Sequence, residues 1–564
     1  MQINLEDIST FTDFGKYREE TRIDNLNESL EKCNNFLEQL KNNEKTEQIA
    51  EILLIKSEIL LNKDRRLSKF ENYLITIEQA ESAIEEFIDK NSSDFKKLMG
   101  YLYYLKGQYL YEIEKHEESL NALILSLELL ETTEDKNMIC QTLFALSYLA
   151  FWLGQADRGI KYSETALELL SEYENPTLKM DVLFSLSKLH TIKGNYELAI
   201  KFSHECTNLA KFLKNEFVYL GSKKIMEAWS NIYIGNYEIA HQMLTDGLEF
   251  TREKGDEWWM FFGFNLLSYV QFIIGKGEEA LQYALESLNI AKKIKRKTYE
   301  AIAYRAVGQG YRNLGNIEKS LECRLKNVEL FEFFRSAFHH SLILFEIIEI
   351  YVNKNKLEEA EKYLLMLEQI KDNTDLDTVT HRYLASKALI FMKYTEPRER
   401  GKAELLFEQL IEEKEIEFYL KVYSLFNLCA LLLIEFQLAE DDKILNRLYK
   451  YLKKLLDIAE TKSLNYIIVE IYILKSKLAL INMEIGEAQN TLEKAQKIAE
   501  FNKLNVLKTK VVKEQEFLKQ KHETWRELIK EEVPFSERTK DVNMDENLNS
   551  MRNQITNKLF VLKI

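Results

Sequence analysis

The sequence contains very little proline. Among its 564 residues there are three, Pro176, Pro397 and Pro534. Proline interrupts helices, so its scarcity allows long helical stretches joined by short turns. Leu, Glu, Lys and Ala, which favour helices, are abundant, and few windows show the strict alternation of strands. The composition therefore predicts an all-α fold.

Cysteine is also scarce and is never clustered. The count is odd and no CxxC pair occurs among Cys33, Cys140, Cys206, Cys323 and Cys429. This spacing argues against a disulfide framework and against a zinc knuckle. We therefore expect a reduced, cytoplasmic protein.

The sequence lacks an excess of positive charge. It has 76 Lys and Arg against 91 Asp and Glu, which gives a formal net charge of −15. Because nucleic-acid backbones attract clustered basic residues, we expect no nucleic-acid partner. The one basic run, "KKIKRK" from Lys292 to Lys297, is typical of a solvated helix end.

The sequence also shows no pattern typical of a targeting segment or a membrane-spanning segment. The first twenty residues have no apolar core behind a basic start, so they do not resemble a signal peptide. No window of about 18–20 uncharged apolar residues is present to span a bilayer. We expect no membrane association.

A repeat of about forty residues runs through the sequence. Similar segments begin at Phe144, Phe184 and Asn265 and continue through the segment "YRAVGQGYRNLGNIEKSLE". Each has a glycine at the same place, and the gaps between these glycines are 40, 41, 40 and 40 residues: Gly154, Gly194, Gly235, Gly275 and Gly315. Glycine at this position predicts a tight turn between two helices. Asn355 is a tolerable substitute, whereas Glu114 departs from the pattern.

Small residues recur at fixed distances from each turn. Five residues after the turn position stand Ser119, Gly159, Ala199, Ala240, Ala280, Ser320 and Ala360. Seven residues before it stand Ser147, Ser187, Ala228, Ser268 and Gly308. Small side chains let the two helices of a pair approach closely, and one pair cannot bury its own apolar face, so the pairs must stack.

This pattern resembles the tetratricopeptide repeat. The match is carried by Tyr304, Val307, Gly308, Tyr311 and Gly315 together with Ser320. The forty-residue period is similar to the longer repeats of kinesin light chains, LGN-type adaptors and bacterial peptide-sensing regulators. The resemblance implies a right-handed superhelical solenoid of stacked antiparallel helix pairs.

The quality of the repeat divides the chain into six regions. We expect an N-terminal capping helix in 1–46, a regular array in 47–370 and degenerate repeats with a turn insertion in 371–460. A clearer repeat follows in 461–500, then C-terminal capping helices in 501–533 and a tail in 534–564.

No motif in the sequence indicates catalysis. The segment "GQGYRNLG" lacks the third glycine of a dinucleotide fingerprint, because Asn313 stands there, and it follows no strand. His190, His204 and Cys206 lie in one hairpin, but His204 and Cys206 are two residues apart and therefore do not share a helix face. We therefore predict no enzyme activity, no metal and no cofactor.

The inner face of the array is the predicted binding surface. In the resemblance, the first helix of each pair, called helix A here, lines the inside of the superhelix. Its inner positions include Phe144, Tyr148, Trp152, Phe184, Lys188, Trp229, Asn265, Tyr269, Phe272, Arg305, Gln309, Arg312 and Asn313. Two interpretations stay open: these side chains form a groove for a peptide, or they pack between helices and fill the bowl.

These features favour a non-enzymatic scaffold that binds a peptide or protein segment with acidic and apolar residues. Asn and Gln suit a peptide backbone, and Arg305 and Arg312 suit carboxylates. The alternatives are a peptide- or ligand-responsive regulator and a fixed subunit of a larger complex.

Overall fold

The computed structural model describes most of the chain between residues 23 and 530. The described ranges are 23–40, 46–67, 70–86, 89–172, 175–193, 195–213, 227–234, 236–254, 257–273, 276–334, 337–374, 376–414, 416–439, 441–461, 464–482, 484–502 and 504–530. Across these ranges the chain forms 24 helices and no strand. The prediction of an all-α fold is confirmed. The predicted tail, 534–564, lies outside the described residues.

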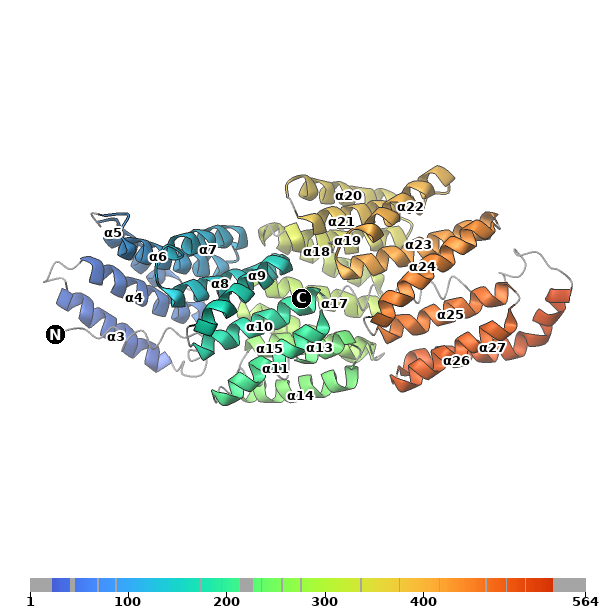
Figure 1. Cartoon of the computed structure of the whole chain (residues 1–564), viewed down its shortest axis with the longest axis horizontal. Helices are drawn as coiled ribbons and strands as arrows, with labels where there is room; N and C mark the ends of the chain where they lie inside the picture. Colours follow the sequence, from blue (N-terminus) through green and yellow to red (C-terminus); the bar gives the residue numbers. More distant parts are fainter. Residues whose placement is uncertain are drawn as a thin grey trace. The chain divides into compact units, whose positions relative to one another are not determined.

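The helices are grouped into two compact units, which are described separately. The first unit ends at Glu227. Its helices follow one another as antiparallel neighbours (Figure 1). They are α3 (Ile23–Leu40), α4 (Thr46–Leu67), α5 (Glu71–Glu85), α6 (Ser93–Glu112), α7 (His116–Leu130), α8 (Lys136–Trp152), α9 (Ala156–Glu172), α10 (Pro176–Lys193) and α11 (Tyr196–Phe212).

The second unit begins at Ala228, in the first turn of α13 (Glu227–Ile234). It continues with α14 (Tyr237–Lys254), α15 (Glu257–Ile273), α16 (Gly277–Ile294), α17 (Lys297–Asn313), α18 (Ile317–Phe334), α19 (Ala337–Asn353) and α20 (Leu357–Asp372). The last helices are α21 (Asp377–Phe391), α22 (Pro397–Glu412), α23 (Phe418–Ala439), α24 (Asp442–Thr461), α25 (Asn465–Ile481), α26 (Ile485–Phe501) and α27 (Asn505–Lys530).

The turns within helix pairs use a left-handed residue, as the repeat predicts. Gly154 and Gly315 have φ angles of 72° and 76°, and Asn355 has 57°. Glu114, where glycine was expected, adopts 64° and makes the same turn. In each of these turns two N–H groups close the helix end, as where Gly315 donates to Arg312 O (3.0 Å) and the next residue donates to Tyr311 O (2.9 Å). Gly194, Gly235 and Gly275 lie outside the described residues.

Small residues bring the two helices of a pair into contact. All seven small residues that follow the turns are buried. Ser119 Oγ on α7 donates to Gly107 O on α6 at 2.7 Å, and Ser187 Oγ on α10 donates to Ala199 O on α11 at 2.9 Å. A Cβ atom on Gly107 would lie 2.7 Å from Leu123 Cγ. Backbones this close leave no room for larger side chains, which explains the small residues in the repeat.

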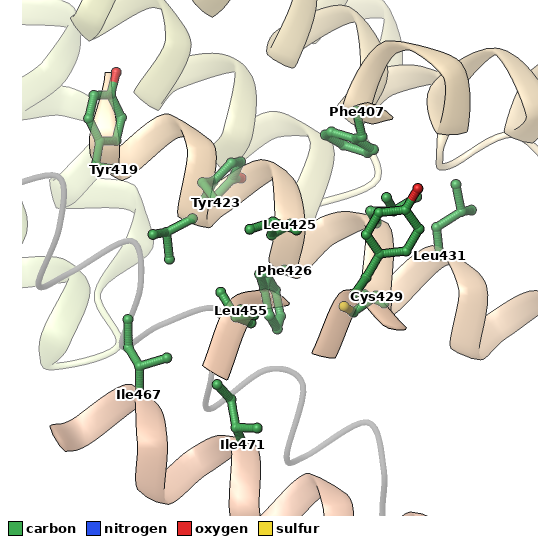
Figure 2. Packing of buried hydrophobic residues seen from close by; sticks show 14 of the residues in the cluster. Phe407, Tyr419, Tyr423, Leu425, Phe426, Cys429, Leu431, Leu455, Ile467 and Ile471 are labelled. Carbon is green, nitrogen blue, oxygen red and sulfur yellow. The ribbon is translucent and has the colours of Figure 1, made fainter. Parts of the chain in front are cut away.

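The core of the second unit is centred on α23. Figure 2 shows this region, in which α23 contributes Tyr423, Phe426 and Cys429, while α24 and α25 contribute Leu455 and Ile471. All five are buried. The motif is blurred here because α23 is buried on nearly every side, so the periodic pattern of one exposed face is lost.

By length and composition alone, α23 is apolar enough to cross a membrane. Its window Tyr419–Ala439 has a mean hydropathy of 1.7, and 72% of that window is buried inside the protein. Central helices of a protein core pass the same test. Since neighbouring helices cover most of this window, we interpret α23 as a core helix.

Two helices lie in regions where the sequence predicts departures from the regular repeat. The first helix of the described residues, α3, lies in the predicted capping region 1–46 and buries Cys33 and Leu40. The turn between α21 and α22 is longer than the described turns within the other helix pairs, since α21 ends at Phe391 and α22 begins at Pro397. Proline suits this first position because its missing N–H has no partner there in any helix.

Candidate functional site

The thirteen residues predicted to line a groove are mostly buried. Trp152, Phe184, Lys188, Trp229, Asn265, Tyr269, Arg305 and Gln309 are each at most 9% exposed. The partly exposed members are Phe144, Tyr148, Phe272, Arg312 and Asn313. The packing of the first eight agrees with the interpretation in which inner-face side chains fill the space between helices. Contact of any of the thirteen with a partner stays a prediction.

In the first unit, the predicted aromatic residues surround a lysine of the same chain. Lys188 Nζ on α10 lies 4.4 Å from the ring centroid of Tyr148 and 4.2 Å from that of Phe151, both on α8. The rings of Trp152 and Phe184 are at 5.9 and 5.6 Å. A cation over aromatic faces is stabilised by the ring quadrupoles, by about 2 kcal/mol when desolvated. The chain's own cation therefore occupies this aromatic cluster.

The histidines of the adjacent hairpin have structural contacts. The ring of His190 stacks on Phe202, with centroids 5.4 Å apart, and His204 Nε2 lies 3.0 Å from Glu227 Oε1. Cys206 Sγ contacts Met180 O at 3.5 Å. Among the residues that the structure describes, no group of three or more His, Cys, Asp or Glu is arranged to hold a metal ion.

In the second unit, the predicted arginines are paired with glutamates of the next repeat. The helices involved, α17 and α19, both pack against α18 (Figure 1). Arg305 Nη2 lies 2.8 Å from Glu346 Oε1. Arg312 contacts Glu349 through two nitrogens, Nη1 to Oε2 at 2.9 Å and Nη2 to Oε1 at 3.3 Å. Both glutamate side chains are at most 3% exposed. The carboxylates that these arginines bind therefore belong to α19.

A third arginine, which the sequence reasoning missed, completes this cluster. Arg324 on α18 is 1% exposed, and its Nε lies 3.1 Å from Glu346 Oε2. Its Nη2 donates to Gln309 Oε1 at 3.2 Å, and its Nη1 donates to Ser320 Oγ at 3.3 Å. A Cβ atom on Gly308 would lie 2.4 Å from Arg324 Nη1, so the glycine makes room for the guanidinium.

Comparison of the repeats contains a signal for Arg324. It stands four residues after the small slot, where the other repeats have only uncharged residues: Leu123, Ser163, Ser203, Leu244, Ala284 and Leu364. Its partner Glu346 stands nine residues before the turn, where the other repeats have Ala145, Ser185, Met226, Leu266 and Ala306. A charge in an otherwise uncharged slot of a repeat is a local exception, and such exceptions gather at functional sites.

The Arg–Glu cluster, defined as Arg305, Arg312, Arg324, Glu346 and Glu349, carries an excess of positive charge. Three guanidiniums face two carboxylates, which gives a formal charge of +1. Burial lowers the pKa of Arg324. The negative charge of Glu346 acts to raise that pKa, whereas the positive charges of Arg312 and Arg305 lower it further. For Arg312, burial acts to lower the pKa, but Glu349 and its hydrogen bonds raise it above the usual value. The cluster as a whole therefore favours additional negative charge.

The cluster reaches the partly exposed end of α17. Arg312 and Asn313 are in its last turn, and both residues are partly exposed, although the Arg312 side chain itself is 8% exposed. Gln309 Nε2 donates to Asn313 Oδ1 at 3.1 Å, while the Asn313 side-chain nitrogen makes no hydrogen bond within the protein. The arrangement can bind a ligand that accepts hydrogen bonds and carries negative charge.

Comparison with known proteins supports the fold. No protein-family model and no curated protein matches the sequence. Among solved structures, the chain is similar to a Rap protein complexed with Competence and Sporulation Factor, at 15% identity and a TM-score of 0.50. That match covers 67% of this chain and 99% of the Rap chain. The protein therefore has the TPR-like architecture of stacked helix pairs.

Two further solved structures are less similar. NprR in complex with its cognate peptide NprX matches at 15% identity and a TM-score of 0.45, over 62% of this chain and 97% of that one. Aspartyl phosphate phosphatase F from Bacillus subtilis matches at 14% identity and a TM-score of 0.41, over 66% and 96%.

Proposed function

We propose that this chain is a cytoplasmic, non-enzymatic TPR-like protein that binds a peptide segment along the inner positions of helix A in its second unit. The observation that carries the proposal is the polar and cationic end of α17. There the residues Arg312 and Asn313 are partly exposed beside the buried Gln309, and the side chain of Arg312 is 8% exposed. Phe272, at the end of the preceding helix A, α15, is also partly exposed.

The chemistry of these side chains suits a peptide. Amide side chains match the donors and acceptors of a peptide backbone, and a partly exposed phenylalanine offers contact to an apolar side chain. The side-chain nitrogen of Asn313 is buried without a hydrogen-bond partner among the described residues, and it is one donor that a peptide carbonyl would satisfy if binding exposes it. The similar Rap protein is described in complex with Competence and Sporulation Factor, so a fold of this kind is compatible with holding a factor.

Selection from a display library of random octapeptides on the full-length chain tests the proposal. We expect peptides that bind the wild type and that lose about tenfold or more in affinity with Asn313→Ala or Phe272→Ala, since each variant removes a central contact. The matched control is Leu285→Ala, which truncates an exposed side chain on α16, the second helix of its pair. Recovery of no peptide, or equal losses in all three variants, would contradict the proposal.

A further inference from the structure

The basic run lies on the surface at one turn of the second unit. It is defined as Lys292, Lys293, Lys295, Arg296 and Lys297, and it spans the end of α16 and the start of α17. The four lysines are exposed, and Arg296 is partly exposed. Five cations therefore gather in one short segment of a chain whose formal net charge is −15.

Helix stability accounts for only part of the basic run. Lys292 and Lys293 are in the last turn of α16, where cations suit the negative pole of the helix dipole. Arg296 and Lys297 are the N-cap and the first residue of α17, where the positive pole of the dipole disfavours cations. One of these costs is offset, because Lys297 Nζ lies 3.1 Å from Glu300 Oε1. A solvated helix end therefore explains the first lysines of the run but not its last two cations.

The backbone of Lys295 adds a second cost. This residue follows α16 and is left-handed, with a φ of 59° and a ψ of 26°. Glycine and asparagine adopt this conformation with less strain than lysine does. Of the four other left-handed residues that the structure describes, three are glycine or asparagine: Gly154, Gly315 and Asn355. A lysine that strains the backbone is expected where its side chain has a use.

The turn between helix pairs does not itself need cations. In the first unit the corresponding turns are acidic in sequence, with "ETTED" at 131–135 and "EYEN" at 172–175. Within the described part of the chain, no ion pair joins Lys292, Lys293 or Lys295 to a carboxylate. These three cations are therefore available to an anion from outside the chain.

We propose that the basic run is a docking surface for a short segment of a partner protein that is rich in Asp or Glu. It lies at the opposite end of α17 from Arg312 and Asn313, about 22 Å along the helix axis. The surface is therefore separate from the peptide-binding positions of the proposed function and goes beyond them. Exposed cations attract an acidic partner at long range and raise its rate of association.

The surroundings of the basic run favour a short anion over a long one. The turns that join successive helix pairs of this unit lie at one edge, because neighbouring helices are antiparallel. At that edge the α20–α21 turn, "KDNTDLD" at 371–377, carries three aspartates and one lysine. A nucleic-acid duplex would extend past the five cations toward such like charges, against the net charge of the chain. A segment of a few carboxylates matches the cations in number.

Fluorescence anisotropy of labelled octaglutamate on the full-length chain tests the proposal, at about 50 mM salt, where screening is weak. Lys292→Gln/Lys293→Gln/Lys295→Gln removes the three available cations. The matched control, Lys443→Gln/Lys450→Gln/Lys453→Gln, makes the same change of net charge with exposed lysines of α24. We expect the first variant to bind about tenfold less tightly than the wild type and the control to lose less than about twofold.

Lys295→Gly separates a role in binding from a role in folding. Glycine relieves the left-handed backbone and removes one cation. We therefore expect a higher melting temperature together with binding of octaglutamate that is about twofold to fivefold weaker. A lower melting temperature with unchanged binding would show that this lysine serves the fold, and the proposal would then be wrong.

The other measurements have equally definite outcomes. Octaglutamate that does not bind the wild type, or that binds both triple variants equally well, overturns the proposal. A thymidine oligonucleotide with the same number of negative charges is measured in parallel. Tighter binding of the oligonucleotide than of octaglutamate overturns the assignment to a protein segment and favours a nucleic acid. Thermal melts check that both triple variants are folded, as expected for exposed positions.

Discussion

Replacing Gly308 by alanine tests the packing of α17 against α18. In an exposed helix interior, Gly→Ala stabilises a protein by about 0.5–1 kcal/mol, because glycine has more backbone entropy to lose. At Gly308 the new Cβ would lie 2.4 Å from Arg324 Nη1, 3.0 Å from Cys323 Cβ and 3.2 Å from Ser320 O. The guanidinium would have to move, although it is held by Gln309 and Glu346.

The expected cost exceeds the gain. Overpacking a close-packed site costs about 1–3 kcal/mol, and each hydrogen bond lost by a charged group costs about 1.5–3 kcal/mol. We therefore expect Gly308→Ala to destabilise the α17–α18 pair by roughly 1–4 kcal/mol. The control is Gly401→Ala in α22, where nothing lies within 4 Å of the new Cβ. That variant should be more stable than the wild type by up to about 1 kcal/mol.

Native-state hydrogen exchange measures this locally. Exchange of the α17 and α18 amides reports the free energy of opening that helix pair, which a global melting temperature of a two-unit chain would average. Faster exchange in α17 for Gly308→Ala, with slower or unchanged exchange in α22 for Gly401→Ala, supports the reasoning. Equal or greater protection of α17 in Gly308→Ala would refute it.

Four further predictions follow from single sites. Arg312→Leu should cost about 3–5 kcal/mol by leaving Glu349 buried and unpaired, and adding Glu349→Leu should recover most of that loss in urea unfolding. Burial lowers the pKa of His116 from 6.5 to about 4, so as the pH falls the unfolded chain binds the proton before the folded chain does. Stability should therefore fall by up to about 3 kcal/mol between pH 6.5 and 4, and His116→Leu should flatten that decline in thermal melts of the full-length chain. Glu114→Gly should raise stability by about 1 kcal/mol in the same melts, because its φ of 64° strains a non-glycine residue. The five cysteines are buried, and burial is the main cause of the raised pKa of Cys33, Cys140, Cys323 and Cys429. A thiol reagent at pH 8 should therefore label the native chain far more slowly than the urea-unfolded chain.

The repeat pattern predicts the fold well because it reports local requirements. A left-handed turn residue and a small residue five positions later are each demanded by backbone geometry within one helix pair. A turn can therefore be predicted from Gly315, and a close helix contact from Ser320, without reference to the rest of the chain. Glu114 shows the limit of this reasoning, since the closed turn holds a residue that the local preference disfavours.

The contacts between repeats are less predictable from one helix at a time. The resemblance placed Arg305 and Arg312 on the inner face of their helix, but it does not say which side chain of α19 lies opposite. The structure places Glu346 and Glu349 there, 41 and 37 residues further along the chain. A comparison of equivalent slots across the repeats would have marked Arg324 and Glu346 as exceptions, because it asks which residue breaks the pattern.

The inner-face aromatic residues illustrate a second limit. The resemblance to the tetratricopeptide repeat placed Tyr148, Trp152 and Phe184 on the inner face of the array, but it does not distinguish an open surface from a covered one. In the structure Lys188 lies among these rings and is 4% exposed. A long side chain from the next repeat is enough to cover such a face.

The most direct test of the central claim is hydrogen exchange of the full-length chain with and without a selected octapeptide. The account predicts slower exchange at the C-terminal ends of α15 and α17, where Phe272, Arg312 and Asn313 lie, with little change on the exposed face of α16. Protection confined to other helices, with α15 and α17 unchanged at saturating peptide, would contradict it.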